Sequence, residues 1–322
     1  MAQLRQQLDD EAKYGVTSIQ ELSDAMAPAR AVALLGRLPA TLRIRIVRMP
    51  GTTPAGRDTA EGNGVPLHPA PLLTVSGSKW LADGVGVEGT LTPRGAWKVP
   101  AHPPLDALMT DLPLEFPASE YPKLLRETLQ RNEQLLLHIS GNRSAATMLD
   151  AIDHTGGPTV WASRRLCFEH GDGIYPDQFA RIRADGIIVV QNPVHLAPIF
   201  QPGVVPFDKA QSLKSLLAAG IPLAFGSDAP PNPYLDILFA THPGNRPSEA
   251  ITREQAVIAY TRTSAYAEFQ EKQKGTLAPG MLADLAVLSQ DIFTVPAPAL
   301  PRTVSLLTMV GGKVVYRDAA FH

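Results

Sequence analysis

Residues 166–192 read LCFEHGDGIYPDQFARIRADGIIVVQN, and this stretch shows how the chain is organised. Its two ends, 166–171 and 186–192, are short runs that begin with apolar residues, and residues 175–184 between them have helical spacing. Such runs are typical of parallel strands that are covered on both faces. The stretch therefore predicts a strand, a helix and a second, parallel strand.

The same alternation continues towards both ends of the chain. Five more apolar or β-branched runs predict strands at 15–22, 41–47, 72–81, 134–140 and 221–228. Helical patterns lie before or between them at 2–14, 27–37, 120–131, 143–152 and 207–219. Strands and helices that alternate in this way predict an α/β protein with a parallel sheet.

The number of predicted strands separates two architectures. A closed (β/α)8 barrel, the TIM barrel, has eight strands, whereas seven are visible here. Because residues 2–14 predict a helix ahead of the first visible strand, we expect a TIM barrel that lacks its first strand. A seven-stranded, doubly wound open sheet is the alternative, and hydrophobic periodicity does not exclude it.

The alternation breaks in a long loop and at the C-terminal end. Residues 82–117 are rich in Gly and Pro, and we expect them to lie as a lid over the end of the third predicted strand. From about residue 275, short alternating strands with a Gly311–Gly312 turn signal predict a hairpin. We therefore expect a barrel at 1–274 and a small β appendage at 275–322.

Composition excludes several classes of protein. The chain has 29 Lys plus Arg and 31 Asp plus Glu, a formal net charge of −2, so it lacks the basic excess of a nucleic-acid-binding protein. The single cysteine, Cys167, excludes both an internal disulfide and a cysteine-rich zinc site. No apolar run approaches the length of a membrane span, and the polar start does not resemble a signal peptide. We expect a cytoplasmic protein that acts on a small molecule.

Residues with the chemistry of metal ligands stand at or near the ends of four predicted strands: Lys79, His138, His170 and Asp228. The active sites of parallel barrels lie at the carboxyl ends of the strands. Two imidazoles and a carboxylate are suitable ligands for zinc or a similar divalent ion. A lone histidine is more often an ordinary core or surface residue, but three ligand residues placed alike favour a metal site.

Other polar residues are candidates for substrate binding. His195 and His242 follow strand ends, and either side chain is able to line a substrate pocket. Arg143 follows another strand end and, like Arg164 and Arg165, is compatible with a substrate carboxylate or with an ordinary surface ion pair. Our candidates for substrate binding are therefore His195, His242 and Arg143.

Six segments resemble, in order, successive motifs of the amidohydrolase superfamily: SGSKWLADG, HISGNRSA, RRLCFEHGD, VVQNPVH, AFGSDAPPNP and KGTLAPGMLADLAVL. The resemblance runs from Gly15 to about Tyr316 and is strongest to the amidohydrolase-3 branch, which includes N-substituted formamide deformylases. It implies a metal-dependent hydrolase of C–N bonds other than peptide bonds, in an amide, a formamide or a cyclic amide. It also implies a (β/α) barrel with a small β-sandwich built from both ends of the chain.

The resemblance implies a role for each of the four strand-end residues. Lys79 matches the lysine that bridges two metal ions as a carbamate, and His138 and His170 match imidazole ligands. Asp228 matches the aspartate that binds metal and acts as general base towards the nucleophilic water. The implied cofactor is one or two divalent ions, zinc first among them, which lower the pKa of bound water and polarise the carbonyl under attack.

The sequence departs from the family in the motif that binds the more buried metal ion. Members carry a His-x-His pair on the first strand, and no His-x-His occurs in this sequence. In the fifth-strand motif, Asn142 stands where members have Asp. We therefore expect at most one firmly held ion, in a chain that lacks the N-terminal part of the family's barrel through truncation of a longer gene or an internal start.

Two alternatives to an active metal-dependent hydrolase stay open. One is a truncated, catalytically inactive barrel fragment or binding module, which the missing His-x-His pair favours. The other is a Schiff-base lyase that uses Lys79, which needs a lysine desolvated to a low pKa. A barrel without its first strand also leaves strand edges at 15–22 and 221–228 unpaired, so we expect self-association through them.

Overall fold

The structure, a computed structural model, describes residues 1–22, 26–39, 41–49, 64–83, 114, 117–196, 211–228, 231–244 and 246–321. Within them, seven parallel strands form one sheet, in which the order of the strands is their order in the chain. The strands are β1 (Ser18–Glu21), β2 (Arg43–Arg48), β3 (Leu73–Leu81), β4 (Leu135–Ile139), β5 (Cys167–His170), β6 (Ile188–Gln191) and β7 (Leu223–Phe225). Each of the seven predicted strand runs overlaps one of them, so the predicted parallel α/β sheet is confirmed.

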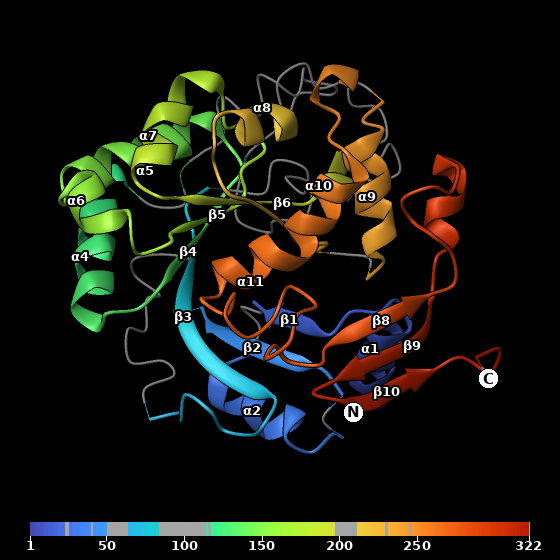
Figure 1. Cartoon of the computed structure of the whole chain (residues 1–322). Coiled ribbons are helices and arrows are strands. Elements are labelled where there is room, and N and C mark those ends of the chain that lie inside the picture. Colours follow the sequence, from blue (N-terminus) through green and yellow to red (C-terminus); the bar gives the residue numbers. More distant parts are fainter. Residues whose placement is uncertain are drawn as a thin grey trace, which may run out of the picture.

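The order of the strands excludes the doubly wound alternative. A doubly wound sheet reverses its direction of growth, so that strands adjacent in the chain are not all adjacent in the sheet. Here every strand pairs in parallel with the next strand of the chain, from β1 through to β7. The sheet also curls as part of a barrel does (Figure 1).

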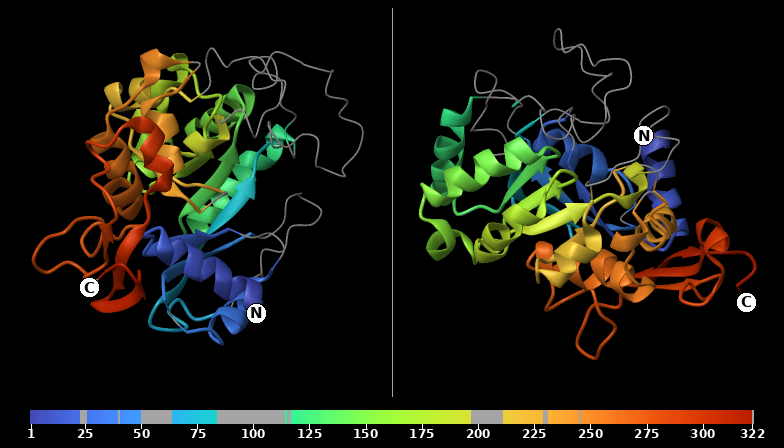
Figure 2. Two further views of the ribbon diagram at one scale, coloured as in Figure 1. Left: turned by 90° about the vertical axis from the view of Figure 1, so that its right-hand side faces the viewer. Right: turned by 90° about the horizontal axis from the view of Figure 1, so that it is seen from above.

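Helices connect the strands and surround the upper part of the curled sheet (Figures 1 and 2). The described α-helices are α1 (Ala2–Lys13), α2 (Pro28–Leu35), α4 (Tyr121–Arg131), α5 (Asn142–Asp153), α6 (Gly157–Trp161), α7 (Phe179–Ala184), α8 (Leu213–Ala218), α9 (Pro233–Thr241), α10 (Arg253–Ile258) and α11 (Ser264–Ala267). The helix predicted at 207–219 is described from Leu213 onward, and most of the predicted lid, 84–113, lies outside the described residues. None of the described helices is long and apolar enough to cross a lipid bilayer.

The alternation of side chains along the strands decides what lies inside the curl. On β4, Leu135 and Leu137 pack with the helices in the largest apolar cluster, whereas Leu136 packs on the inner side with Cys167 of β5. Residues two apart on a strand share a face. His138 therefore has its side chain on the inner side, two residues beyond Leu136.

A second, smaller sheet stands at the C-terminal end of the chain. It is antiparallel, in the order β10-β9-β8, and consists of β8 (Leu285–Leu288), β9 (Ser305–Val310) and β10 (Lys313–Arg317). Gly311 and Gly312, with φ of 58° and 77°, form the predicted turn between β9 and β10. The sheet lies beside α1 (Figure 1), and the hydroxyl of Thr308 donates to the carbonyl of Ala12 at 2.6 Å. The two ends of the chain are thus neighbours.

Candidate metal centre

The four residues expected as metal ligands lie at or near the carboxyl ends of four strands. Lys79 is close to the end of β3, His138 is on β4, His170 ends β5, and Asp228 follows β7. The first three are buried, with between 4% and 8% of each residue exposed, whereas 57% of the Asp228 side chain is exposed. The site therefore combines three buried side chains that carry nitrogen atoms with one accessible carboxylate.

Three imidazole rings follow one another towards Asp228. The ring centroids of His138 and His170 are 4.3 Å apart, and those of His170 and His195 are 5.7 Å apart with nearly parallel planes. Oδ2 of Asp228 lies 3.8 Å from Nε2 of His195. One ligand atom from each of His170, His195 and Asp228 lies within 4.8 Å of the other two. Ligand atoms on one tetrahedral zinc ion stand about 3.4 Å apart, so the widest of these separations would have to close by roughly 1.4 Å for all three to reach a single ion.

The backbone turns sharply at two of these residues. His170 and Asp228 have left-handed conformations, with φ of 73° and 58°. Such conformations cost non-glycine residues about 1–3 kcal/mol and cluster at functional sites. Strict alternation would send His170 to the outer side of β5, because Cys167 faces inward. Its left-handed turn instead places the ring beside that of His138.

The surroundings of His170 keep its ring neutral. Burial lowers the pKa of His170 well below its usual value, and the neighbouring His138 and Lys79 lower it further. A side-chain hydrogen bond with Asn192 acts in the opposite direction but does not reverse the shift. Neutral imidazole is the form that binds a metal ion. His170 is therefore able to bind a cation at neutral pH without first losing a proton.

Asp83, which the sequence did not single out, lies behind His138. Its carboxylate accepts hydrogen bonds from the N–H groups of Ser140 at 3.0 Å and Gly141 at 2.7 Å, and from the hydroxyl of Ser144. It also lies 3.7 Å from Nε2 of His138, and burial raises the pKa of Asp83 to about 7. Asp83 thus links the end of β3 to the start of α5 and limits the orientations open to His138.

Two further buried carboxyl groups, Glu169 and Asp172, face the site from β5 and the loop after it. Burial raises the pKa of both, opposed at Glu169 by Lys79 and at Asp172 by His195. Oε1 of Glu169 has no hydrogen-bond partner in the described structure. Glu169 was not singled out from the sequence, although its place directly before His170 and its inward parity with Cys167 were a signal by which it could have been found.

His195 reaches the site through a short 3-10 helix, η4 (Pro193–Leu196), that follows β6. Asp236 of α9 holds this turn, because its carboxylate accepts a hydrogen bond from the N–H of Val194 at 2.6 Å. The hydroxyl of Tyr260 donates to the other oxygen of Asp236, also at 2.6 Å. The position of His195 therefore depends on a residue 41 positions later in the chain.

We expect the substitution Asp236→Asn to change how stability depends on pH. Burial raises the pKa of Asp236 to about 7, against about 3.9 in an unfolded chain. Because the folded chain holds this proton more tightly, Asp236 stabilises most below pH 4, and the contribution is lost as the pH rises towards 7. From pH 5 to pH 8 the wild type should lose about 3 kcal/mol of unfolding free energy relative to Asp236→Asn. Urea unfolding at both pH values measures this, and parallel pH profiles of the two chains would contradict it.

The three residues expected to bind substrate are not gathered at one place. His195 joins His170 and Asp228, as described above. Arg143, near the start of α5, is exposed, and so is His242, whose Nδ1 lies 2.9 Å from the hydroxyl of Thr241. No described contact links Arg143 or His242 to His170, so their roles in substrate binding stay predictions.

The motifs and the geometry agree with a comparison against protein families. The model of the Amidohydrolase family matches residues 2–316 of the chain. The chain belongs to this family. The amidohydrolase resemblance inferred from the six segments is thereby confirmed.

Two curated relatives match over shorter stretches. Protein LONG AFTER FAR-RED 3 of Arabidopsis thaliana is 29% identical over 199 residues, which cover 57% of this chain and 34% of that protein. Putative amidohydrolase YtcJ of Bacillus subtilis (strain 168) is 27% identical over 215 residues, which cover 61% of this chain and 40% of that protein. The matched part thus spans between one third and two fifths of the length of these relatives.

Solved structures of hydrolases share the fold. An uncharacterised metal-dependent hydrolase from Pyrococcus horikoshii OT3 has a TM-score of 0.66 at 20% identity, over 87% of this chain and 57% of that one. A prolidase complexed with N-methylphosphonate-L-proline has a TM-score of 0.64 at 18% identity, over 98% and 80%. A triazine hydrolase variant has a TM-score of 0.62 at 17% identity, over 98% and 71%. The curled seven-stranded sheet is therefore similar to the barrels of these hydrolases.

The side chains at this end of the sheet fit the divalent ion that the family implies. Two imidazoles and a carboxylate are a donor set typical of zinc and similar ions. Their ligand atoms already converge, and burial keeps His170 neutral. The buried Oε1 of Glu169, without a hydrogen-bond partner in the described structure, is an oxygen that a nearby cation would stabilise.

Proposed function

We propose that this amidohydrolase holds a divalent metal ion, zinc in the first instance, and hydrolyses C–N bonds other than peptide bonds. The observation that carries the proposal is the convergence of His170, His195 and Asp228 within 4.8 Å at the carboxyl ends of the strands. Family membership supports a metal-dependent hydrolase. The finer substrate class, an amide, a formamide or a cyclic amide, rests on the resemblance to N-substituted formamide deformylases.

In the proposed ligand set, His195 takes the place of Lys79 and His138, which the sequence implied as ligands together with His170 and Asp228. His170, His195 and Asp228 hold the ion, and His138, whose ring is 4.3 Å from that of His170, stands next to them. Lys79 affects the pKa of both His170 and Glu169. We propose that it closes the inner side of the site, as an ammonium group or, after modification by CO2, as a carbamate ligand.

The chain's own residues would guide the proton during hydrolysis. A bound divalent ion would polarise the substrate carbonyl and make water a stronger acid. Asp228 is the accessible carboxylate of the group, so we propose that it accepts the proton of the attacking water and returns it to the departing amine. The neighbouring His195 ring, 3.8 Å from Oδ2 of Asp228, would keep that carboxylate turned towards the reaction.

A second candidate is a metal-binding module that does not turn over substrate. The observation in its favour is the complete absence of a His-x-His pair from the sequence. With one ion instead of two, water activation depends on a single Lewis acid. Turnover of an N-substituted formamide or a cyclic amide by the purified chain, lost after chelation, separates an enzyme from a binding module.

We also propose how the fold relates to the complete barrel. The seven strands in sequential order suggest a (β/α)8 barrel without its first strand, and the separate antiparallel sheet suggests a division into 1–274 and 275–322. Within the described sheet, β1 and β7 are the outer strands. We propose self-association through these strands, and a monomeric mass in solution would contradict it.

The substitution His170→Ala tests the metal site directly. Because His170 is the buried imidazole of the group, we expect metal content to fall at least tenfold after equilibration with a limiting zinc buffer. Measurement by elemental mass spectrometry gives metal per chain. His154→Ala is the matched control, since His154 is exposed and its ring is bonded, within the described residues, only to the carbonyl of Asp150. Equal metal content in His170→Ala and the wild type would show that His170 is not a ligand.

A further inference from the structure

A cavity of about 780 Å³ lies away from the candidate metal centre. It is bounded by the first half of β3, the C-terminal end of α4, the loop before β5 and the residues after α11. We call it the arginine cleft, after Arg45, Arg48, Arg131 and Arg164 in its wall. Its volume falls within the range of about 300–1,000 Å³ that is typical of small-molecule sites. None of the candidate metal ligands is among the residues described in its wall.

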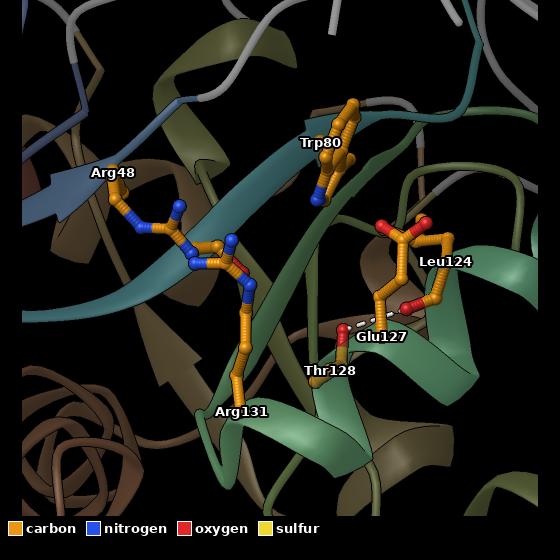
Figure 3. Close-up of a pocket in the computed structure, with 7 residues that line it drawn as sticks. Arg48, Trp80, Leu124, Glu127, Thr128 and Arg131 are labelled. Carbon is orange, nitrogen blue, oxygen red and sulfur yellow. Dashed lines mark hydrogen bonds between the residues drawn. The ribbon is translucent and has the colours of Figure 1, made fainter. Parts of the chain in front are cut away.

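The wall of the arginine cleft carries a positive excess in a chain that is acidic overall. The four arginines face two glutamates, Glu133 and Glu268, so the charged residues described there sum to +2. The chain as a whole has a net charge of −2. Figure 3 shows an adjoining pocket, in which the guanidinium groups of Arg48 from β2 and Arg131 from α4 point towards one another. Positive charge is thus gathered here from distant parts of the chain.

The most buried charge of the cleft, Arg45, is bonded to neutral groups. Only 7% of Arg45 is exposed. Its guanidinium donates to the hydroxyl of Ser76 at 2.9 Å and to the side-chain carbonyls of Gln20 at 2.8 Å and Gln134 at 2.7 Å. Its remaining bond is to the backbone carbonyl of Ser76. Buried charges in proteins are normally paired with an opposite charge, and in the part of the chain that the structure describes no carboxylate is hydrogen-bonded to Arg45.

Neither glutamate of the wall is hydrogen-bonded to Arg45 in the described structure. Glu133 accepts a hydrogen bond from Arg48, another residue of the wall, at 2.6 Å, and Glu268 forms an ion pair with Lys274 at 2.9 Å. Burial lowers the pKa of Arg45, and the charges of Glu268, Cys167 and Glu169 oppose this shift without reversing it. An anion in the cleft would supply the missing negative charge.

The backbone of β3 makes room for this guanidinium. Gly77 has φ of 78°, and a Cβ there would lie 2.9 Å from Nη2 of Arg45 and 3.1 Å from the carbonyl oxygen of Gln134. Any side chain at position 77 would therefore displace Arg45 or strain the strand. The arginine is built into the wall of the cleft.

We propose that the arginine cleft binds a small organic dianion with an apolar body, as a site separate from the metal centre. The charge excess of +2 matches a dianion, and guanidinium groups pair well with carboxylate and phosphate oxygens. The apolar body would rest on Leu67 and Phe269, which also line the cleft and are 66% and 47% exposed. Dicarboxylates and phosphate monoesters share this chemistry.

Phthalate and phenyl phosphate are suitable probes, because each is a dianion on an aromatic ring. Calorimetric titration of the purified full chain at constant ionic strength measures binding, with neutral benzamide as the uncharged comparison. We expect at least one dianion to bind in a 1:1 ratio and at least tenfold more tightly than benzamide, and the tighter of the two identifies the ligand as a dicarboxylate or a phosphate ester. If neither dianion binds, or benzamide binds equally well, the proposal is overturned.

Two arginine substitutions locate the binding. Arg131→Ala and Arg164→Ala should each weaken the dianion about tenfold, because each removes a charge-assisted contact. Arg126→Ala is the matched control, since Arg126 is exposed on the same helix, α4, and is not described in the wall. Affinities that are unchanged in both cleft variants would overturn the proposal.

The variant His170→Ala separates this site from the metal centre. Carboxylates and phosphates also bind metal ions, so binding at the centre would disappear with the metal. We expect His170→Ala to bind the dianion as tightly as the wild type does, and this expectation does not depend on whether the chain has the proposed hydrolase activity. If His170→Ala loses binding while Arg131→Ala and Arg164→Ala keep it, the anion binds the metal ion and the proposal is overturned.

Discussion

Replacement of Asp228 by asparagine lowers the proposed hydrolysis by about 10²–10⁴-fold in kcat, the usual contribution of a positioned general base. Asparagine has nearly the same shape but accepts no proton near neutral pH. It keeps one carbonyl oxygen directed at the ion, so we expect metal content to fall less than in His170→Ala. Initial rates with an N-substituted formamide and metal analysis of the same samples measure both quantities.

The control for this substitution is Asp177→Asn, since Asp177 is an exposed carboxylate in the turn before α7. That variant should keep both kcat and metal content. A wild-type kcat in Asp228→Asn would show that the proton goes to another group. Glu169 and Asp172 would then be the carboxyl groups to replace next, because both are within electrostatic reach of Asp228.

Replacement of Phe168 by alanine should cost about 3–5 kcal/mol of unfolding free energy. Phe168 is fully buried on the outer side of β5, within the largest apolar cluster. Removal of its ring leaves a cavity between the sheet and the helices, and the neighbouring side chains are too closely packed to fill it. Urea unfolding followed by circular dichroism measures the loss.

Phe293→Ala is the matched control, because Phe293 is 50% exposed and its loss should change stability by less than about 0.5 kcal/mol. A similar small effect in both variants would mean that β5 is not packed against the helices as described. Phe168 lies between Cys167 and Glu169, which have inward parity. The experiment therefore also tests the alternation that directs side chains into the candidate site.

The sequence predicted the strands well, for a simple physical reason. A parallel strand is covered on both faces, so it appears as a short apolar run whatever surrounds it. The run 134–140 contains β4, and the run 166–171 contains β5, each within two residues at either end. The Gly311–Gly312 turn was equally visible, because a tight hairpin needs two residues of positive φ.

The composition of the candidate site was harder to predict. His138, His170 and Asp228 follow from their places near strand ends, but His195 was expected to bind substrate and now stands with His170 and Asp228. Its place is set by η4, which Asp236 holds from α9. No local pattern records a hydrogen bond between residues this far apart in the chain.

The sequence alone determined that this chain belongs to the amidohydrolase family, with a parallel sheet and candidate ligand residues at the carboxyl ends of its strands. The hydrophobic pattern of a strand is a local property, so it can be recognised in one segment of the sequence without knowledge of what that segment contacts in the fold. The tertiary structure decided the rest: which rings meet at the candidate metal centre, that Asp83 lies behind His138, and that arginines from β2, α4 and the loop before β5 share one cleft. These arrangements depend on curvature of the sheet and on turns at single residues such as His170, which bring side chains together from segments that share no sequence pattern.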